Sequence, residues 1–174
     1  MTKNKLLCPY YVRRFEQHDE LKASLLQLIE EQNVEDILKP ETADKISKTD
    51  WYIKNNSVKL YWNLFSPHLP AHLNEIFRDL QYGKYKFCDY WFQQYRNSDT
   101  HLWHRHDGCN WANVYYLELD KDSPPTNFME PYTKEIIKPE VQEGDILTFP
   151  SFVMHCSPPN VSTSRKTIIA FNIF

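Results

Sequence analysis

The amino-acid sequence predicts a mainly β fold, a jelly roll (a cupin-like, double-stranded β-helix) with N-terminal α-helices packed on it. Aromatic and β-branched residues are concentrated in short runs through residues 85–174, as is typical of strands in a half-buried sheet. No helical pattern separates these runs, which favours antiparallel sheets, closed or sandwiched. We therefore expect a single domain over 1–174, with a helical part over about 1–84 and a jelly-roll core over about 85–174.

Two helices are expected in the N-terminal part, because apolar residues recur there at helical spacing between residues 21 and 32 and again after Pro70. The periodic positions are Leu21, Leu25, Leu28 and Ile29 in the first segment and Leu73, Ile76, Phe77 and Leu80 in the second. Asp19 is a candidate N-cap of the first helix, and Gly83 is the candidate stop of the second. The polar segment 33–57 between them is expected to be mostly loop.

The strands expected in the second half are separated by segments rich in turn residues. The expected strands are 85–95, 111–119, 135–137, 145–149 and 166–174. The turn segments are 123–127, 142–145 and 157–160. Proline, glycine, asparagine and aspartate in these segments favour turns for distinct steric and hydrogen-bonding reasons. The pattern therefore predicts successive antiparallel strands with no linker between them.

Composition excludes several classes of protein. The net charge of -3, from 20 basic and 23 acidic residues, provides no single-sign field for extended nucleic-acid or membrane binding. The only glycines are Gly83, Gly108 and Gly144, which is too few for a Walker A loop or a dinucleotide-binding fingerprint. The four cysteines form no CxxC pair, and no apolar segment approaches bilayer length. We therefore expect a cytoplasmic protein with no membrane partner.

Three histidines are candidate metal ligands. His104 and His106 lie two apart beside an expected strand, where side chains at that spacing share a face. His155 lies just beyond a strand that ends at Pro150. Distant strands can face each other across the interior of a jelly roll, so the three imidazoles can meet one ion. Imidazole suits iron, zinc, copper and nickel alike, and ligand type alone does not choose the metal.

Asp107 is a candidate for the carboxylate of a 2-His-1-carboxylate site, the set typical of non-haem iron oxygenases. At three residues from His104 it points to the opposite face of a regular strand, unless Gly108 permits a bulge. We therefore rank His106 above Asp107 as the third ligand. The alternative is that residues 104–107 form a polar turn near the rim of a sheet.

The C-terminal strand begins with two cations, Arg165 and Lys166. An arginine would grip an anionic partner bidentately, whereas a lysine would act as a point charge. The two lie on opposite faces of the strand. If Thr167 packs outward, Lys166 and Asn172 face the cavity, where Asn172 is a candidate for a polar contact. A polar interior for Asn172 favours Lys166, and the alternative is that both cations are solvated at the strand entrance.

Taken together, the motifs resemble the 2-oxoglutarate and iron(II)-dependent oxygenase superfamily, and more closely its phage and bacterial branch with a WHxH motif and a VYYL strand. The matching segments are WHRHD at 103–107, VYYL at 114–117, GDILTFPS at 144–151 followed by His155, and Arg165-Lys166 ahead of Phe171-Asn172. The match covers roughly 85–174, and its specificity comes from the order and spacing of the segments together.

For the metal, the resemblance implies that His104 and His155 bind iron(II) and that His106 takes the place of the carboxylate in the commoner HxD motif. This departure from the usual pattern leaves open a three-histidine centre, Asp107 as the true ligand, or a site that has lost activity.

For the cosubstrate, the resemblance implies that Arg165 or Lys166 binds the far carboxylate of 2-oxoglutarate. Tyr116 matches a position that hydrogen-bonds this carboxylate, and Tyr95 matches one near the metal-binding end. The implied activity couples oxidative decarboxylation of 2-oxoglutarate by O2 to hydroxylation of a small-molecule or protein side-chain substrate. The rival interpretations are a cupin-type three-histidine enzyme without 2-oxoglutarate, which the cation at 165 or 166 disfavours, and a non-catalytic jelly-roll binding protein.

Overall fold

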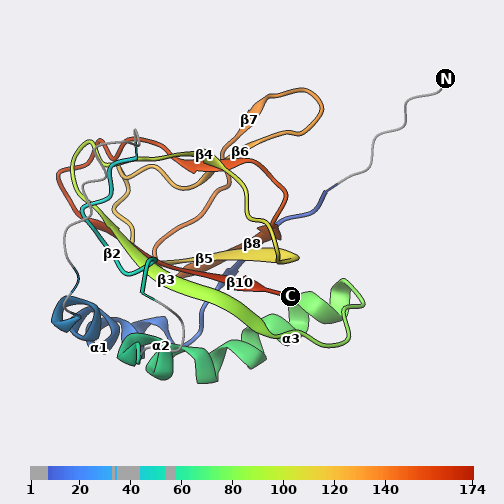
Figure 1. The fold of residues 1–174 in the computed structure, drawn as a ribbon, viewed down its shortest axis with the longest axis horizontal. Coiled ribbons are helices and arrows are strands. Elements are labelled where there is room, and N and C mark those ends of the chain that lie inside the picture. Colours follow the sequence, from blue (N-terminus) through green and yellow to red (C-terminus); the bar gives the residue numbers. More distant parts are fainter. Residues whose placement is uncertain (1–7, 33, 35–43, 54–57) are drawn as a thin grey trace.

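The computed structural model describes residues 8–32, 34, 44–53 and 58–174. It consists of two antiparallel sheets with the helices on one side (Figure 1). The helices are α1 (His18–Glu31), α2 (Leu60–Phe65), the single 3-10 turn η1 (Ser66–His68) and α3 (Leu69–Asp79). The mainly β fold class with flanking helices that the sequence predicts is confirmed.

The larger sheet has six strands and the smaller sheet four. In spatial order, the larger sheet contains β1 (Tyr11–Arg14), β8 (Asp145–Pro150), β5 (Trp111–Glu118), β10 (Lys166–Ile173), β3 (Phe87–Tyr95) and β2 (Lys48–Thr49). The smaller sheet contains β4 (His101–His104), β9 (His155–Ser157), β6 (Asn127–Met129) and β7 (Ile136–Ile137). Apart from the β6–β7 pair, neighbouring strands in each sheet are distant in the sequence, as the crossovers of a jelly roll require.

The larger sheet lies between two apolar clusters, so its strands are buried on both faces. On one face Ile169, Phe171 and their neighbours pack against the helices. On the other, Ile168, Phe149 and Tyr116 face the smaller sheet. Along β10 this alternation directs Thr167 towards the helices and Lys166 into the space between the sheets. This is the register in which Lys166 and Asn172 share the interior face of the strand.

Local structure in the N-terminal part differs from the sequence-based expectation. Two strands, β1 and β2, join the larger sheet from this part of the chain. Helix α1 begins at His18 without a side-chain cap, and Asp19 lies in its first turn, 3.2 Å from the Arg14 guanidinium. Helix α3 ends before Gly83, because Gln81 takes the left-handed conformation (φ 54°) that ends it. The expected loop over 33–57 lies partly outside the described residues.

Among the helices in the described part of the chain, none combines the length and apolar character needed to cross a membrane.

Candidate metal centre

Three histidines converge where the ends of β4 and β9 meet. His104 ends β4 and is the register partner of His155, which begins β9. His106 follows two residues later, and its backbone N–H donates to the Ser151 carbonyl at 3.0 Å. The ring centroids of His104 and His155 are 4.1 Å apart, and those of His106 and His155 are 4.9 Å apart. One ligand atom from each of the three residues lies within 4.8 Å of the others.

Each of these imidazoles has an oxygen acceptor opposite its Nδ1 atom. His104 Nδ1 lies 2.7 Å from the Leu102 carbonyl, and His155 Nδ1 lies 2.9 Å from the Val153 carbonyl. His106 Nδ1 lies 2.8 Å from Oδ1 of Asn172. Because these oxygens only accept, each Nδ1 carries the proton and each Nε2 keeps its lone pair. Carbonyl or amide oxygens on the far nitrogen are the usual partners of metal-binding histidines.

Burial keeps the three rings neutral. It is the largest cause lowering the pKa of His104 and of His106, and it lowers the pKa of His155 well below its ordinary value. The neighbouring imidazoles act in the same direction on His155. Since a metal ion binds the neutral imidazole, the rings are in the protonation state required of ligands near pH 7.

The structure does not bring Asp107 into this cluster. Its side chain is 92% exposed, and its carboxylate lies 3.9 Å from Arg105 Nε. Gly108 does take a left-handed conformation (φ 76°), as a bulge would require, but the turn leaves the Asp107 carboxylate in solvent. The three-histidine arrangement is therefore the one that the geometry supports.

A cavity of about 540 Å³ adjoins the histidines. His104 and His106 line it together with Gln93, His101 and Asn172. The rest of its wall combines aromatic side chains with charged ones, and it includes Trp51, Tyr90, Trp91, Asp44, Asp89, Arg105 and Asp107. The Trp91 ring lies 5.6 Å from the ring of His106. This is the size and composition typical of a small-molecule site.

Lys166 lies inside the barrel and is 1% exposed. Its ammonium donates to Ser157 Oγ at 2.6 Å and to the Pro124 carbonyl at 2.9 Å. It also lies 4.5 Å from the centroid of the Tyr95 ring. Burial lowers the pKa of Lys166 to about 7, and the Cys156 thiol opposes this effect. Lys166 is thus a buried cation without a carboxylate partner among the described residues.

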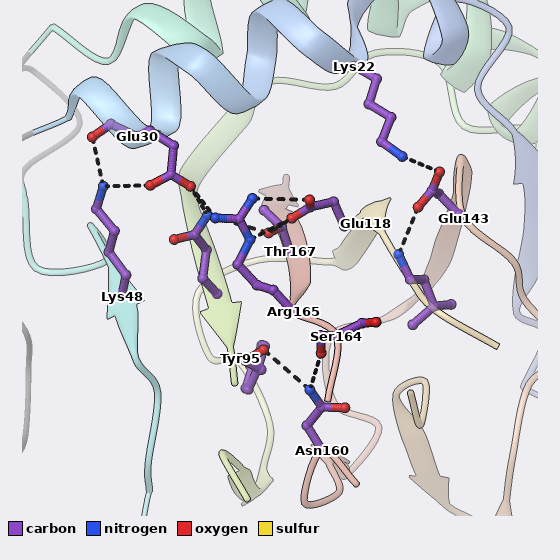
Figure 2. A network of polar contacts seen from close by, with 12 residues as sticks. Lys22, Glu30, Lys48, Tyr95, Glu118, Glu143, Asn160, Ser164, Arg165 and Thr167 are labelled. Carbon is purple, nitrogen blue, oxygen red and sulfur yellow. Dashed lines mark hydrogen bonds and ion pairs between the residues drawn. The ribbon is translucent and has the colours of Figure 1, made fainter. Parts of the chain in front are cut away.

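Arg165 lies on the opposite face of β10, outside the barrel. Its Nε and Nη2 atoms donate to the two carboxylate oxygens of Glu118 at 2.8 and 3.0 Å. Its Nη1 atom also pairs with Glu30 of α1. Figure 2 shows the guanidinium held between these carboxylates, with Thr167 and Lys48 beside them. Arg165 therefore joins α1 to the sheet and is not brought near the histidines.

The two tyrosines singled out in the sequence are both buried inside the barrel. Tyr116 accepts a hydrogen bond at its hydroxyl from the Thr126 backbone N–H at 3.1 Å. Tyr95 donates to Gln93 Oε1 at 2.8 Å. Gln93, Ser157 and His101 also lie at the site and were not predicted from the sequence, although a histidine three residues before His104 was a signal available there.

No family model matches the sequence, and no curated protein matches it. The fold, by contrast, is similar to solved structures. A viral collagen prolyl hydroxylase from Paramecium bursaria Chlorella virus-1, in complex with 2-oxoglutarate, has a TM-score of 0.65 and 16% identity, with 94% of each chain covered. A prolyl-4-hydroxylase from Pseudomonas putida has a TM-score of 0.66 and 15% identity, covering 95% of this chain and 92% of that one.

A third similar structure is SnoN, a non-haem α-ketoglutarate-dependent epimerase of nogalamycin biosynthesis. Its TM-score is 0.71 and its identity 10%, with 96% of this chain and 78% of that one covered. The structural neighbours are thus 2-oxoglutarate and iron(II)-dependent oxygenases. At these identities the likeness shows the fold, a double-stranded β-helix, and not the activity.

Proposed function

We propose that this protein is a non-haem iron(II) dioxygenase that couples oxidative decarboxylation of 2-oxoglutarate to hydroxylation of a small molecule or a protein side chain. One observation carries the proposal: three neutral imidazoles gather in the barrel that also encloses Lys166, which has no carboxylate partner among the described residues. The likeness of the fold to enzymes that use this cosubstrate supports it.

The donor set fits iron(II). His104, His106 and His155 offer three Nε2 lone pairs, and three protein ligands leave coordination positions open for other groups. Iron(II) held there would supply the oxygen-activating chemistry of the reaction. Because all three ligands are neutral, the ligand set itself does not compensate the double charge of the metal. A dianion such as 2-oxoglutarate is therefore a favourable partner for the centre.

Lys166 is the residue that we assign to the far carboxylate of 2-oxoglutarate. A buried ammonium with only neutral hydrogen-bond partners gains most from a carboxylate, because its own desolvation has already occurred on folding. Tyr116 and Tyr95 lie in the same apolar cluster and are assigned to the walls of the cosubstrate site. Arg165 already has two carboxylate partners and is excluded from this role.

The substrate would enter the cavity beside His106. Its volume of about 540 Å³ suits a small molecule or one protein side chain. The structural neighbours include both prolyl hydroxylases and an epimerase. The three-histidine set also favours a second candidate, a cupin-type metalloenzyme without 2-oxoglutarate, but that enzyme would have no use for Lys166.

Succinate formation from 2-oxoglutarate tests the proposal directly. Protein purified without oxygen is loaded with iron(II), supplied with 2-oxoglutarate and air, and assayed for succinate in the absence of added substrate. We expect slow, iron-dependent turnover in the wild type and none in His155→Ala. His68→Gln changes a histidine on the helical side of the molecule and is the matched control. A wild type that binds iron(II) but neither binds nor converts 2-oxoglutarate would favour the cupin-type alternative.

A further inference from the structure

A row of hydrogen bonds runs along the barrel wall from Lys166 towards the metal centre. The Lys166 ammonium donates to Ser157 Oγ at 2.6 Å, and the Ser157 hydroxyl is hydrogen-bonded to Tyr95. The Tyr95 hydroxyl donates to Gln93 Oε1 at 2.8 Å. The amide nitrogen of Gln93 then faces Nδ1 of His101 at 3.4 Å. At the His101 end the direction of the row is fixed, because Gln93 Oε1 accepts from Tyr95 and the amide nitrogen of Gln93 is left to donate.

This direction sets the tautomer of His101. The Gln93 amide nitrogen can only donate, so Nδ1 of His101 accepts and the ring proton is on Nε2. In the three candidate ligands the arrangement is reversed, because their Nδ1 atoms face oxygen acceptors. His101 therefore lacks the Nε2 lone pair that a ligand needs, and it presents an N–H donor in its place.

His101 is nevertheless held directly against the centre. Its ring is stacked on that of His104, with centroids 3.9 Å apart and planes 23° apart, and it lines the same cavity. The Asp44 carboxylate lies 4.0 Å from its Nε2 atom, which is beyond hydrogen-bond distance. Among the described residues the Nε2–H donor has no hydrogen-bond partner, so it can meet a group bound beside His104.

We propose that His101 is a cosubstrate-binding residue whose Nε2–H donates to the carboxylate of 2-oxoglutarate that chelates the metal. This inference rests on the proposed function. The cosubstrate is a five-carbon diacid with a carboxylate at each end. Lys166, at one end of the row of hydrogen bonds, provides a cation for the far carboxylate. His101, at the other end and beside His104, provides a neutral donor for the near carboxylate. His101 then orients the chelating end without competing for the metal.

Two substitutions distinguish the contribution of the His101 N–H donor from that of its aromatic ring. His101→Phe keeps an aromatic ring stacked on His104 but removes the N–H, whereas His101→Gln keeps an amide donor. Ile136→Ala, at an exposed position of β7 in the same sheet, is the control. Metal affinity is measured with cobalt(II) alone from its visible absorption. Cosubstrate affinity is measured by titrating the anaerobic iron(II) protein with 2-oxoglutarate and following the charge-transfer absorption of the complex.

We expect cobalt(II) affinity to stay within about threefold in every variant. We expect the 2-oxoglutarate dissociation constant to rise about tenfold or more in His101→Phe, as for loss of a hydrogen bond to a charged group, and to stay within about threefold in His101→Gln and Ile136→Ala. Unchanged 2-oxoglutarate affinity in His101→Phe, or loss of cobalt(II) binding along with it, overturns the role of His101 and leaves the proposed function standing. A wild type that binds no metal, or binds metal but not 2-oxoglutarate, overturns both.

Discussion

Lys166 shows how one buried residue can weaken a fold at neutral pH. Its pKa is about 7 in the folded protein, against 10.5 for an ordinary lysine, because burial disfavours the charged form. Between these values the unfolded chain binds more protons than the folded one, so the free energy of unfolding rises with pH across this window. Below about pH 7 the penalty is present in full, on the order of a few kcal/mol.

We therefore predict that Lys166→Met is more stable than the wild type at pH 6 and that its advantage shrinks towards pH 10. Denaturant unfolding at several pH values measures this. The groups that face Lys166 are Cys156, which opposes its pKa shift, and the ring of Tyr95. Lys138→Met, at an exposed lysine, should show no such pH dependence. A constant difference between Lys166→Met and the wild type across the range would contradict the buried charge.

Asn172 contacts the candidate metal centre through one ring nitrogen of His106. Its Oδ1 atom accepts from His106 Nδ1 at 2.8 Å and so fixes the ligand tautomer of His106. Loss of such a partner typically costs about 10–100-fold in metal affinity. We predict that Asn172→Ala weakens cobalt(II) binding by about tenfold and that Asn172→Asp, which keeps an acceptor, does not. Competition with a coloured chelator measures both constants.

Asp107→Ala is the matched control for this experiment, because it removes a carboxylate next to His106 that points into solvent. We expect its cobalt(II) affinity to equal that of the wild type. A loss comparable to that of Asn172→Ala would instead return Asp107 to the ligand set.

At the scale of elements, the two cations at the start of β10 perform different tasks because the strand alternates its faces. Arg165 joins α1 to the sheet through Glu30 and Glu118, and it lies behind the sheet as seen from the cavity. We predict that Arg165→Ala lowers the free energy of unfolding by about 1–2 kcal/mol, as for a partly exposed network, and leaves 2-oxoglutarate affinity unchanged. Denaturant unfolding and the anaerobic titration measure the two effects. Lys166→Met should show the opposite result, with 2-oxoglutarate binding lost.

The long elements could be predicted from the sequence, and the short ones could not. Strands β3, β5 and β10 and helix α3 each have enough residues for a periodic pattern. Strands β4 and β9, which carry His104 and His155 of the candidate metal centre, have only four and three residues. Their pairing comes from the turns and sheets around them, which no local pattern records. The three candidate ligands could be recognised from the sequence because they are histidines. Their convergence in space and the tautomer of His101 could be found only from the three-dimensional structure.

The candidate centre brings together segments that are far apart in the chain. His104 and His155 are on paired strands of the smaller sheet, and Lys166 is on the larger sheet. A ligand that bridges them binds only the folded state, so it must stabilise the whole domain rather than one element. This coupling makes thermal unfolding a direct report on whether the two sheets enclose one site.

We predict that iron(II) or cobalt(II), each at about 100 times its dissociation constant, raises the free energy of unfolding by about 2.7 kcal/mol. For a domain of this size that corresponds to a rise in Tm of roughly 5–10 °C. Adding 2-oxoglutarate should raise Tm further only when metal is present, because its chelating end requires the ion. Calorimetry with metal, cosubstrate and both measures this. His155→Ala should show neither rise, and a metal-independent shift with 2-oxoglutarate would place its binding away from the three histidines.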